Sequence, residues 1–157
     1  MNDERIEETL DREDIQIASL DKRFFAFIVD ALLIATLASI INIETIVQLN
    51  TQGFRDTIQA LNAIPMLFLQ IFALGFFYQG LFTFWYGASL GKMLFKIQVI
   101  SIDMLDSPSL LRSFTRAFLR EFSQVIYYIP FVFAFGDNFK RTLYDRITHT
   151  IVISQKR

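Results

Sequence analysis

The chain has 157 residues, 53% of them hydrophobic, with 18 Phe and a formal net charge of -1. Its mean hydropathy of +0.38 exceeds what a soluble domain needs for its core, so the composition predicts a single integral membrane domain. The near-neutral charge argues against a nucleic-acid partner, which would require a basic surface, and the lack of cysteine excludes disulfides and thiolate metal sites. We therefore expect neither a metal nor a cofactor.

Residues 1–17 form an acidic segment, the opposite of the basic start of a signal peptide, so the first apolar helix is expected to be retained. Ile6 and Leu10 allow a short amphipathic helix on the surface, and a solvated tail fits the same composition. Residues 18–157 are assigned to the membrane domain.

A first membrane span is predicted at about residues 24–43, where Asp30 is the only ionisable side chain. An Asp inside a membrane helix costs about 2.5 to 3.5 kcal/mol, so it requires a partner or a polar cavity. Arg23 lies nearly two turns earlier on the same helix face. We expect Arg23 to extend to the lipid headgroups, and we expect Asp30 to serve function rather than only bond to a neighbouring helix.

Residues 44–63 are more polar and predict a loop, within which residues 54–61 are compatible with a helical turn or two at the membrane interface. A second span is predicted at about residues 64–86, which carry no charge. Within it, Gln70 and Gln79 either hydrogen-bond to neighbouring helices, which we favour, or line a pathway.

The segment after the second span contains Gly87, Gly91 and Lys92. A phosphate-binding loop would need four residues between its glycines and a Ser or Thr after the Lys. Here three residues separate the glycines and Met93 follows the Lys, so we exclude nucleotide binding.

Two short β-strands are predicted at about residues 95–101 and 148–154, from alternating hydrophobicity in the first and β-branched residues in the second. An isolated strand leaves its backbone groups unpaired. We therefore expect the two strands to form a small ladder in the cytoplasm.

A third apolar segment is predicted at about residues 110–136. Arg112, Arg116 and Arg120 recur every four residues, so they form one stripe on a helix. The apolar part behind this stripe is too short to span, and a proline breaks it at residues 128–130. The segment is therefore expected to be re-entrant or interfacial.

The distribution of basic residues sets the expected topology. By the positive-inside rule, both termini and the connection after the second span lie in the cytoplasm, which two spans satisfy and three do not. The predicted fold class is an all-α membrane protein with two full transmembrane helices, a Pro-interrupted third helical segment and a small cytoplasmic two-stranded ladder.

These stretches resemble the successive signatures of RDD-family membrane proteins at residues 18–30, 86–99, 112–120 and 145–152. The family is named for one arginine and two aspartates, which by position correspond to Arg23, Asp30 and Asp145. Members often carry a Gly-containing turn where this chain has His149. The resemblance implies a multi-pass protein of the bacterial cytoplasmic (inner) membrane. Transport of unknown ligands is a further expectation from the resemblance, and some members look like cation/proton antiporters.

We expect a structural or interaction module of a membrane assembly, held together by a buried charge network. The network residues are Arg23, Asp30, Arg116, Arg120 and Asp145. Its expected partners are membrane lipids and either a second copy of the chain or another membrane protein. An enzyme is not expected, since the sequence offers no pair of nucleophile and base.

Two alternatives remain open. The first is a homo-oligomeric Na⁺ or K⁺/H⁺ antiporter that binds a monovalent cation or a proton at Asp30, with Gln70 and Gln79 lining the path. The second is an anionic-lipid-binding protein in which headgroups bind to Lys92, Arg112 and Arg116.

Overall fold

The computed structural model describes residues 3–51, 57–102, 105–125, 136–137 and 139–155. It is mostly helical with one small antiparallel sheet, as predicted. In chain order the elements are α1 (Asp3–Arg12), α2 (Leu20–Ile41), α3 (Ile43–Thr51), α4 (Thr57–Tyr86), α5 (Leu90–Leu94), β1 (Ile97–Ser101), α6 (Leu110–Val125), α8 (Leu143–Ile147) and β2 (Thr150–Ser154).

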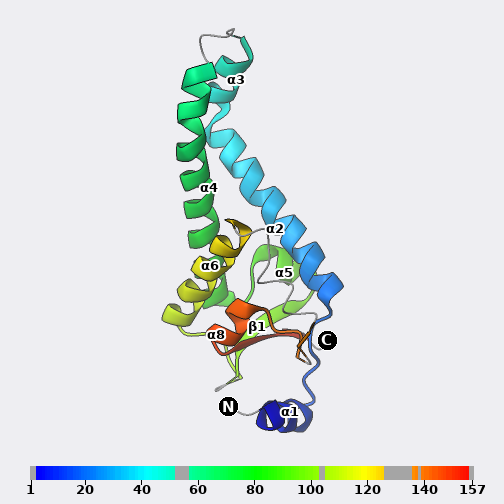
Figure 1. Ribbon diagram of the computed structural model, residues 1–157. Helices are drawn as coiled ribbons and strands as arrows, with labels where there is room; N and C mark the ends of the chain where they lie inside the picture. The colour runs from blue at the N-terminus through cyan, green and yellow to red at the C-terminus, as the bar shows by residue number, and fades with distance from the viewer. Residues whose placement is uncertain (1–2, 52–56, 103–104, 126–135, 138, 156–157) are drawn as a thin grey trace.

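The two long helices α2 and α4 form the frame of the molecule (Figure 1). They lie close together near α3 and diverge toward the other end, where α5 and α6 fill the space between them and where both chain termini lie. The segments Leu20–Ile41 and Ile64–Tyr86 are long and apolar enough to cross a membrane, which confirms the two apolar helices expected from the sequence. The first begins earlier than predicted because Ser19 caps it by accepting a hydrogen bond from the backbone N–H of Lys22.

The predicted ladder is present as the antiparallel pair of β1 and β2. Val99 lies opposite Val152, and neighbouring residues alternate between the two faces of the ladder. One face packs against Ala18 and Ala26 at the start of α2. The ladder therefore positions the start of α2 against the last strand of the chain.

The other face of the ladder carries the acidic N-terminal segment. Residues Asp3–Arg12 form the amphipathic helix that was one of the two alternatives. Leu10 of this helix is buried against Ile100 and Ile151. The segment is thus docked onto the ladder.

The loop predicted for residues 44–63 is wrong where α3 covers Ile43–Thr51. The helical turns allowed within residues 54–61 are present from Thr57, where α4 begins. In α3 the apolar residues Ile43, Ile46 and Val47 recur at helical spacing and are exposed. The polar residues between them indicated a loop, yet they are compatible with a helix that projects beyond the core.

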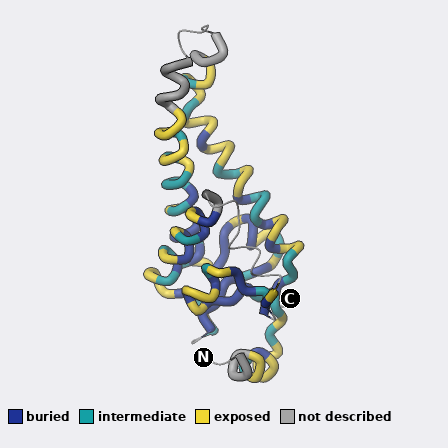
Figure 2. The backbone as a smooth tube through the Cα atoms, in the orientation of Figure 1, coloured by how far each residue is buried: buried dark blue, intermediate teal, exposed yellow. Residues whose placement is uncertain are grey.

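The distribution of side chains is inverted relative to a soluble domain, because charged side chains are buried and many large apolar ones are exposed. Figure 2 shows mostly exposed and intermediate residues along α2 and α4, and buried residues gathered toward α5, α6 and the ladder. On α6, the side chains of Leu111, Phe118 and Phe122 are exposed, whereas Arg116 and Arg120 are only 5% and 9% exposed. This helix covers the start of the predicted third segment, and its predicted break at residues 128–130 lies outside the described residues. Its polar stripe faces the protein and its apolar side faces outward.

Candidate functional site

Asp30 lies in the middle of α2 and is buried, with 2% of its surface exposed. Oδ1 accepts hydrogen bonds from Tyr78 Oη at 2.7 Å and from the Gly91 backbone N–H at 2.9 Å. Oδ2 accepts from Gln79 Nε2 at 3.0 Å and from Ser89 Oγ at 2.6 Å. The carboxylate therefore joins α2 to α4 and to the start of α5.

A glycine makes this close approach of α5 to α2 feasible. A Cβ at Gly91 would meet the backbone carbonyl oxygen of Ala26 and would lie 2.8 Å from Asp30 Oδ1. Only a residue without a side chain allows the α5 backbone to reach the carboxylate. Gly91, which resembled part of a phosphate loop, thus serves helix packing.

The positive charge nearest to Asp30 comes from α6. Arg120 Nη2 lies 3.7 Å from Asp30 Oδ2, and its guanidinium lies over the ring of Phe27 at 5.6 Å. Arg120 Nη1 is buried and has no hydrogen-bond partner in the described part of the chain. Arg120 thus retains an unused donor inside the protein.

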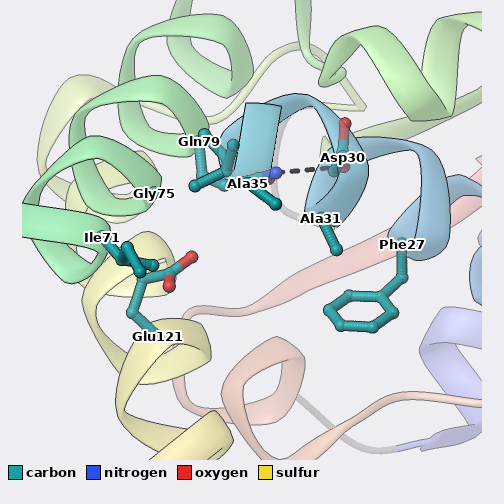
Figure 3. Close-up of a pocket in the computed structure, with 9 residues that line it drawn as sticks. Phe27, Asp30, Ala31, Ala35, Ile71, Gly75, Gln79 and Glu121 are labelled. Carbon is teal, nitrogen blue, oxygen red and sulfur yellow. Dashed lines mark hydrogen bonds between the residues drawn. The ribbon is translucent and has the colours of Figure 1, made fainter. Parts of the chain in front are cut away.

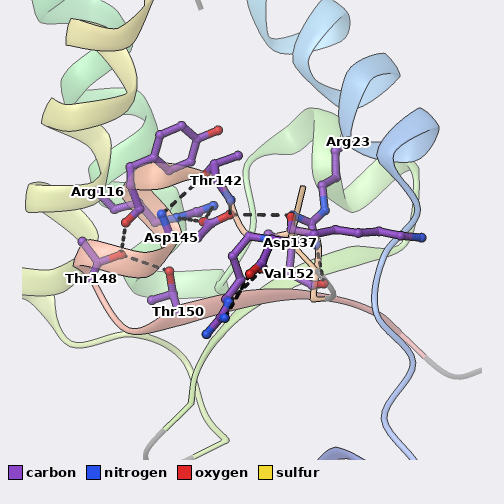
Figure 4. A network of polar contacts seen from close by, with 11 residues as sticks. Arg23, Arg116, Asp137, Thr142, Asp145, Thr148, Thr150 and Val152 are labelled. Atoms are coloured by element: carbon purple, nitrogen blue, oxygen red, sulfur yellow. Dashed lines mark hydrogen bonds and ion pairs between the residues drawn. The ribbon is translucent and has the colours of Figure 1, made fainter. Parts of the chain in front are cut away.

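Asp145, at the start of α8, forms a second carboxylate centre (Figure 4). Its Oδ1 accepts from Nε and Nη2 of Arg116, at 2.9 and 2.5 Å. Its Oδ2 accepts from the backbone N–H of Thr142, whose hydroxyl accepts in return from the Asp145 N–H, so the two residues form a capping box. Burial raises the pKa of Asp145, but the charges of Arg116 and Arg23 and the bonds from Thr142 outweigh it and lower that pKa.

Arg23 connects this centre to the start of α2. Its Nη1 lies 3.6 Å from Asp145 Oδ2 and donates to the carbonyl of Lys140 at 2.6 Å, and its Nη2 donates to the carbonyl of Val152 at 3.0 Å. The side chain is 7% exposed. The expectation that Arg23 extends to the lipid headgroups is therefore wrong: the charge of Asp145 and two carbonyls draw it inward.

A third carboxylate was missed by the sequence analysis. Both oxygens of Asp137 accept from the Arg141 guanidinium, at 2.9 and 3.1 Å, and Oδ1 accepts from Arg146 Nη2 at 2.6 Å. Burial raises the pKa of Asp137, but these bonds and the Arg141 backbone N–H outweigh it and lower the pKa to about 2. The spacing of four residues between Asp137 and Arg141 was the available signal.

Lys92 and Arg112, proposed as headgroup ligands with Arg116, occupy different environments. Lys92 is only 8% exposed, and the described residues offer its ammonium no hydrogen bond or close ion pair. Burial, followed by the charges of Arg116 and Arg120, holds the pKa of Lys92 well below its usual value. Arg112 is half-buried and donates to Ser101 Oγ at 2.5 Å. The role in headgroup binding stays a prediction for these residues.

A cavity of about 120 Å³ lies between α2, α4 and α6 (Figure 3). Asp30, Gln79 and Glu121 supply its polar groups. Gln70 instead accepts a hydrogen bond from Asn42 Nδ2 at 2.9 Å and does not line this cavity. Within the described residues, no group of three or more acidic, histidine or cysteine side chains is placed to hold a metal ion.

The geometry thus brings the five predicted network residues together in two linked centres. Asp30 and Arg120 form one centre, and Arg23, Arg116 and Asp145 form the other. The arginine stripe expected on the third segment supplies a partner to each. This arrangement explains why the two aspartates are tolerated in an apolar chain.

Comparison with known proteins places the chain in a family. No curated protein and no solved structure matches it. The model of the RDD family matches residues 17–149, which include both carboxylate centres. By this match over most of its length, the chain belongs to the RDD family.

Proposed function

We propose that this chain is a multi-pass protein of a bacterial cytoplasmic membrane, in which the Arg/Asp network is the structural core of a module of a larger assembly. The inverted distribution of side chains carries the proposal. Arg23, Asp30, Arg116 and Asp145 are 7% exposed or less, whereas Leu32 and Ile40 on α2 are 63% and 64% exposed. Such a surface is favourable in lipid and unfavourable in water.

The two long helices fit two membrane crossings. Both termini lie at the end of the molecule opposite α3, as a hairpin of two spans requires. The outward apolar face of α6 fits a segment that enters the membrane or lies at its surface. In this topology both termini face the cytoplasm.

The network itself has the form of a structural core. Each of its ion pairs joins two different elements: α2 with α6, α2 with α8, and α6 with α8. In a low-dielectric interior, removing one partner of such a pair leaves an uncompensated charge and costs about 3 to 5 kcal/mol. We assign the network to fixing the diverging helices in one arrangement and assign no catalytic activity to the chain.

The module's interaction surface is its apolar exterior. α2 and α4 bury little of their surface against each other or the remainder of the chain. In a membrane these faces contact lipid, a second copy or another membrane protein. Native mass spectrometry of the full chain in its wild-type form and as Asp145→Asn measures whether assembly depends on the intact network.

A double-mutant cycle tests the structural role. Asp145→Asn and Arg116→Gln are each expected to lower the free energy of unfolding in lipid micelles by about 3 to 5 kcal/mol, and the double variant by clearly less than the sum. Asp21→Asn, at an exposed position of the same type, serves as the control. Additive effects of the two variants would contradict a shared structural core.

The cavity supplies a specific observation for the antiporter alternative, since Asp30, Gln79 and Glu121 line a space of about 120 Å³ that admits water or a small cation. We favour the structural role because both Asp30 oxygens already accept two hydrogen bonds each. Proton movement measured in proteoliposomes with a pH-sensitive dye distinguishes the antiporter from the structural module. Na⁺- or K⁺-driven proton movement that is lost in Asp30→Asn would favour antiport, and its absence from folded protein favours the module.

A further inference from the structure

We propose that a groove beside α1 binds a basic cytoplasmic segment of a partner membrane protein. This α1 groove has a volume of about 400 Å³ and is lined by Glu7, Leu10, Asp11, Ile15, Gln16, Ile17 and Phe139. The described residues that line it include none of the charge network. The inference rests on the function proposed above, because a module of a membrane assembly needs a partner, and it names the kind of partner.

The walls of the α1 groove are fixed by the fold. Ile17 forms an antiparallel bridge with Ile153 of β2, so the segment after α1 adds to the ladder. The Ile15 N–H donates to the carbonyl of Leu10 at 2.9 Å, which ties this segment to the end of α1. Leu10 is itself buried against the ladder. Because the walls are ordered before a partner arrives, binding does not bear the entropic cost of ordering them.

The floor of the α1 groove is apolar. Leu10 and Phe139 are buried, and Ile15 and Ile17 beside them are half-buried. An apolar side chain that covers the remaining exposed surface of such a floor is removed from water, which is favourable. The floor therefore favours a ligand with at least one apolar side chain.

The rim of the α1 groove is acidic. Glu7 and Asp11 both line the groove, are exposed and lie one turn apart on α1, a spacing at which like charges repel each other. A cation bound between them relieves this repulsion and pairs with both carboxylates. The guanidinium of Arg141 lies over the ring of Phe139 at 4.9 Å, but it already donates to both oxygens of Asp137.

The surface around the groove extends this negative charge. Glu8, Glu13 and Asp14 are also exposed, and Arg12 is the one exposed base within residues 7–14. Such a surface repels anionic lipid headgroups, nucleic acids and acidic peptides, and it attracts basic segments. The charge and the apolar floor together select a ligand that carries basic and apolar side chains.

Membrane proteins supply segments of this chemistry on the side where the groove lies. α1 lies beyond the ladder, at the end of the molecule opposite α3 (Figure 1), which faces the cytoplasm in the topology proposed above. Short cytoplasmic loops of membrane proteins are enriched in Lys and Arg. Where such a loop meets its own transmembrane helix, basic residues stand next to apolar ones, which matches the rim and the floor of the groove.

The rival interpretation is that the acidic face of α1 is only a solvated surface. A solvated surface attracts cations according to its total charge and does not distinguish the carboxylates of the groove from those beside it. A binding groove distinguishes them, and it also requires an apolar residue in the ligand. These two differences define the experiment.

The experiment measures the binding of short labelled peptides to the full chain in phosphatidylcholine nanodiscs by fluorescence anisotropy, with empty nanodiscs as the blank. The first peptide consists of Lys and Ser with a central pair of Leu, the second has Ser in place of Leu, and the third has Glu in place of Lys. We expect the first to bind most tightly and the third not to bind. Combining Glu7→Gln with Asp11→Asn should weaken binding of the first peptide about threefold to tenfold, as expected for two exposed ion pairs.

A matched control removes the same charge outside the groove. Glu8→Gln combined with Glu13→Gln changes two exposed carboxylates that do not line it and should retain the binding. If the Glu7 and Asp11 double variant does not fold, Asp11→Asn alone replaces it. Failure of the first peptide to bind, equal losses in the two double variants, or equal binding of the peptide without Leu would overturn the proposal.

Native mass spectrometry tests the other occupant, a second copy of the chain. A dimer that the Glu7 and Asp11 double variant abolishes would overturn the proposal, because it would assign the groove to self-association. The test is independent of the double-mutant cycle on Arg116 and Asp145. Additive effects in that cycle with peptide binding intact would contradict the structural role of the network and support the groove, whereas loss of peptide binding alone would contradict only the groove.

Discussion

Arg23 Nη1 lies 3.6 Å from Asp145 Oδ2, so the arginine at the head of α2 pairs with the aspartate of α8 and not with Asp30 of its own helix. Asp30 in turn has the Arg120 guanidinium of α6 at 3.7 Å. Each aspartate thus meets a charge from a different element. The pairs hold together segments that are far apart in the chain.

Replacing Arg23 by Lys keeps the positive charge but removes the planar guanidinium that donates to two carbonyls at once. A guanidinium donates to the carbonyls of Lys140 and Val152 at the same time, and an ammonium lacks this planar fork. We expect Arg23→Lys to lower the free energy of unfolding by about 1 to 3 kcal/mol, measured by denaturant titration in micelles. Lys22→Arg, at the adjacent exposed position, should change little. Equal stability of Arg23→Lys and wild type would show that charge alone suffices.

Adding one methyl group at Gly91 should separate α5 from α2. The new Cβ would collide with the backbone of Ala26, which cannot rotate away. We expect Gly91→Ala to cost about 1 to 3 kcal/mol of stability in a thermal or denaturant melt. In the control Gly75→Ala, the nearest atoms belong to the end of the flexible Glu121 side chain, 2.7 Å away. A larger loss at Gly75 than at Gly91 would refute this account of the packing.

Acid should weaken the contact between Asp137 and its arginines. The pKa of Asp137 is lowered from 3.8 to about 2 in the folded protein, so between these values the unfolded chain binds a proton that the folded chain does not. Its stabilising contribution is fully present above about pH 3.8 and is lost as the pH falls to about 2. Asp137→Asn should therefore show a shallower fall of the unfolding midpoint in this window. A parallel fall in both proteins would assign the acid sensitivity to other groups.

The turn before β2 should tolerate glycine better than histidine. His149 is exposed and has a φ of 50°, in the left-handed region that glycine adopts without a steric penalty. We expect His149→Gly to raise the free energy of unfolding by about 1 kcal/mol. His149→Ala keeps the Cβ and serves as the control, with no such gain. Equal effects of the two variants would assign the change to the imidazole ring.

The regular elements were predictable because their signals are local. Two long apolar runs, the first containing Asp30 as its one ionisable residue, predicted α2 and α4, and a period of two along residues 95–101 predicted β1. The arginine spacing on the third segment gave a helix with one polar stripe. Each of these patterns depends only on neighbours in the sequence.

The partners of the charged residues were not predictable in the same way. A shared helix face links Arg23 to Asp30, but only the path of the chain decides which other element approaches each of them. That path depends on Gly91, whose missing side chain lets α5 reach Asp30. Asp137 escaped notice because it lies outside any periodic stretch. Long-range contacts of this kind need the fold before they can be assigned.

Because Arg23 donates to the carbonyl of Val152, completion of the network waits for the final strand, Thr150–Ser154, to leave the ribosome. When α2 is synthesised, neither Arg120 nor Asp145 yet exists, so the nascent helix carries Asp30 and Arg23 without their eventual counterions. The early intermediate must therefore rely on water, lipid or the insertion machinery for compensation. A ribosome stalled before β2 would hold a chain with both long helices made and Arg23 still lacking its Val152 acceptor.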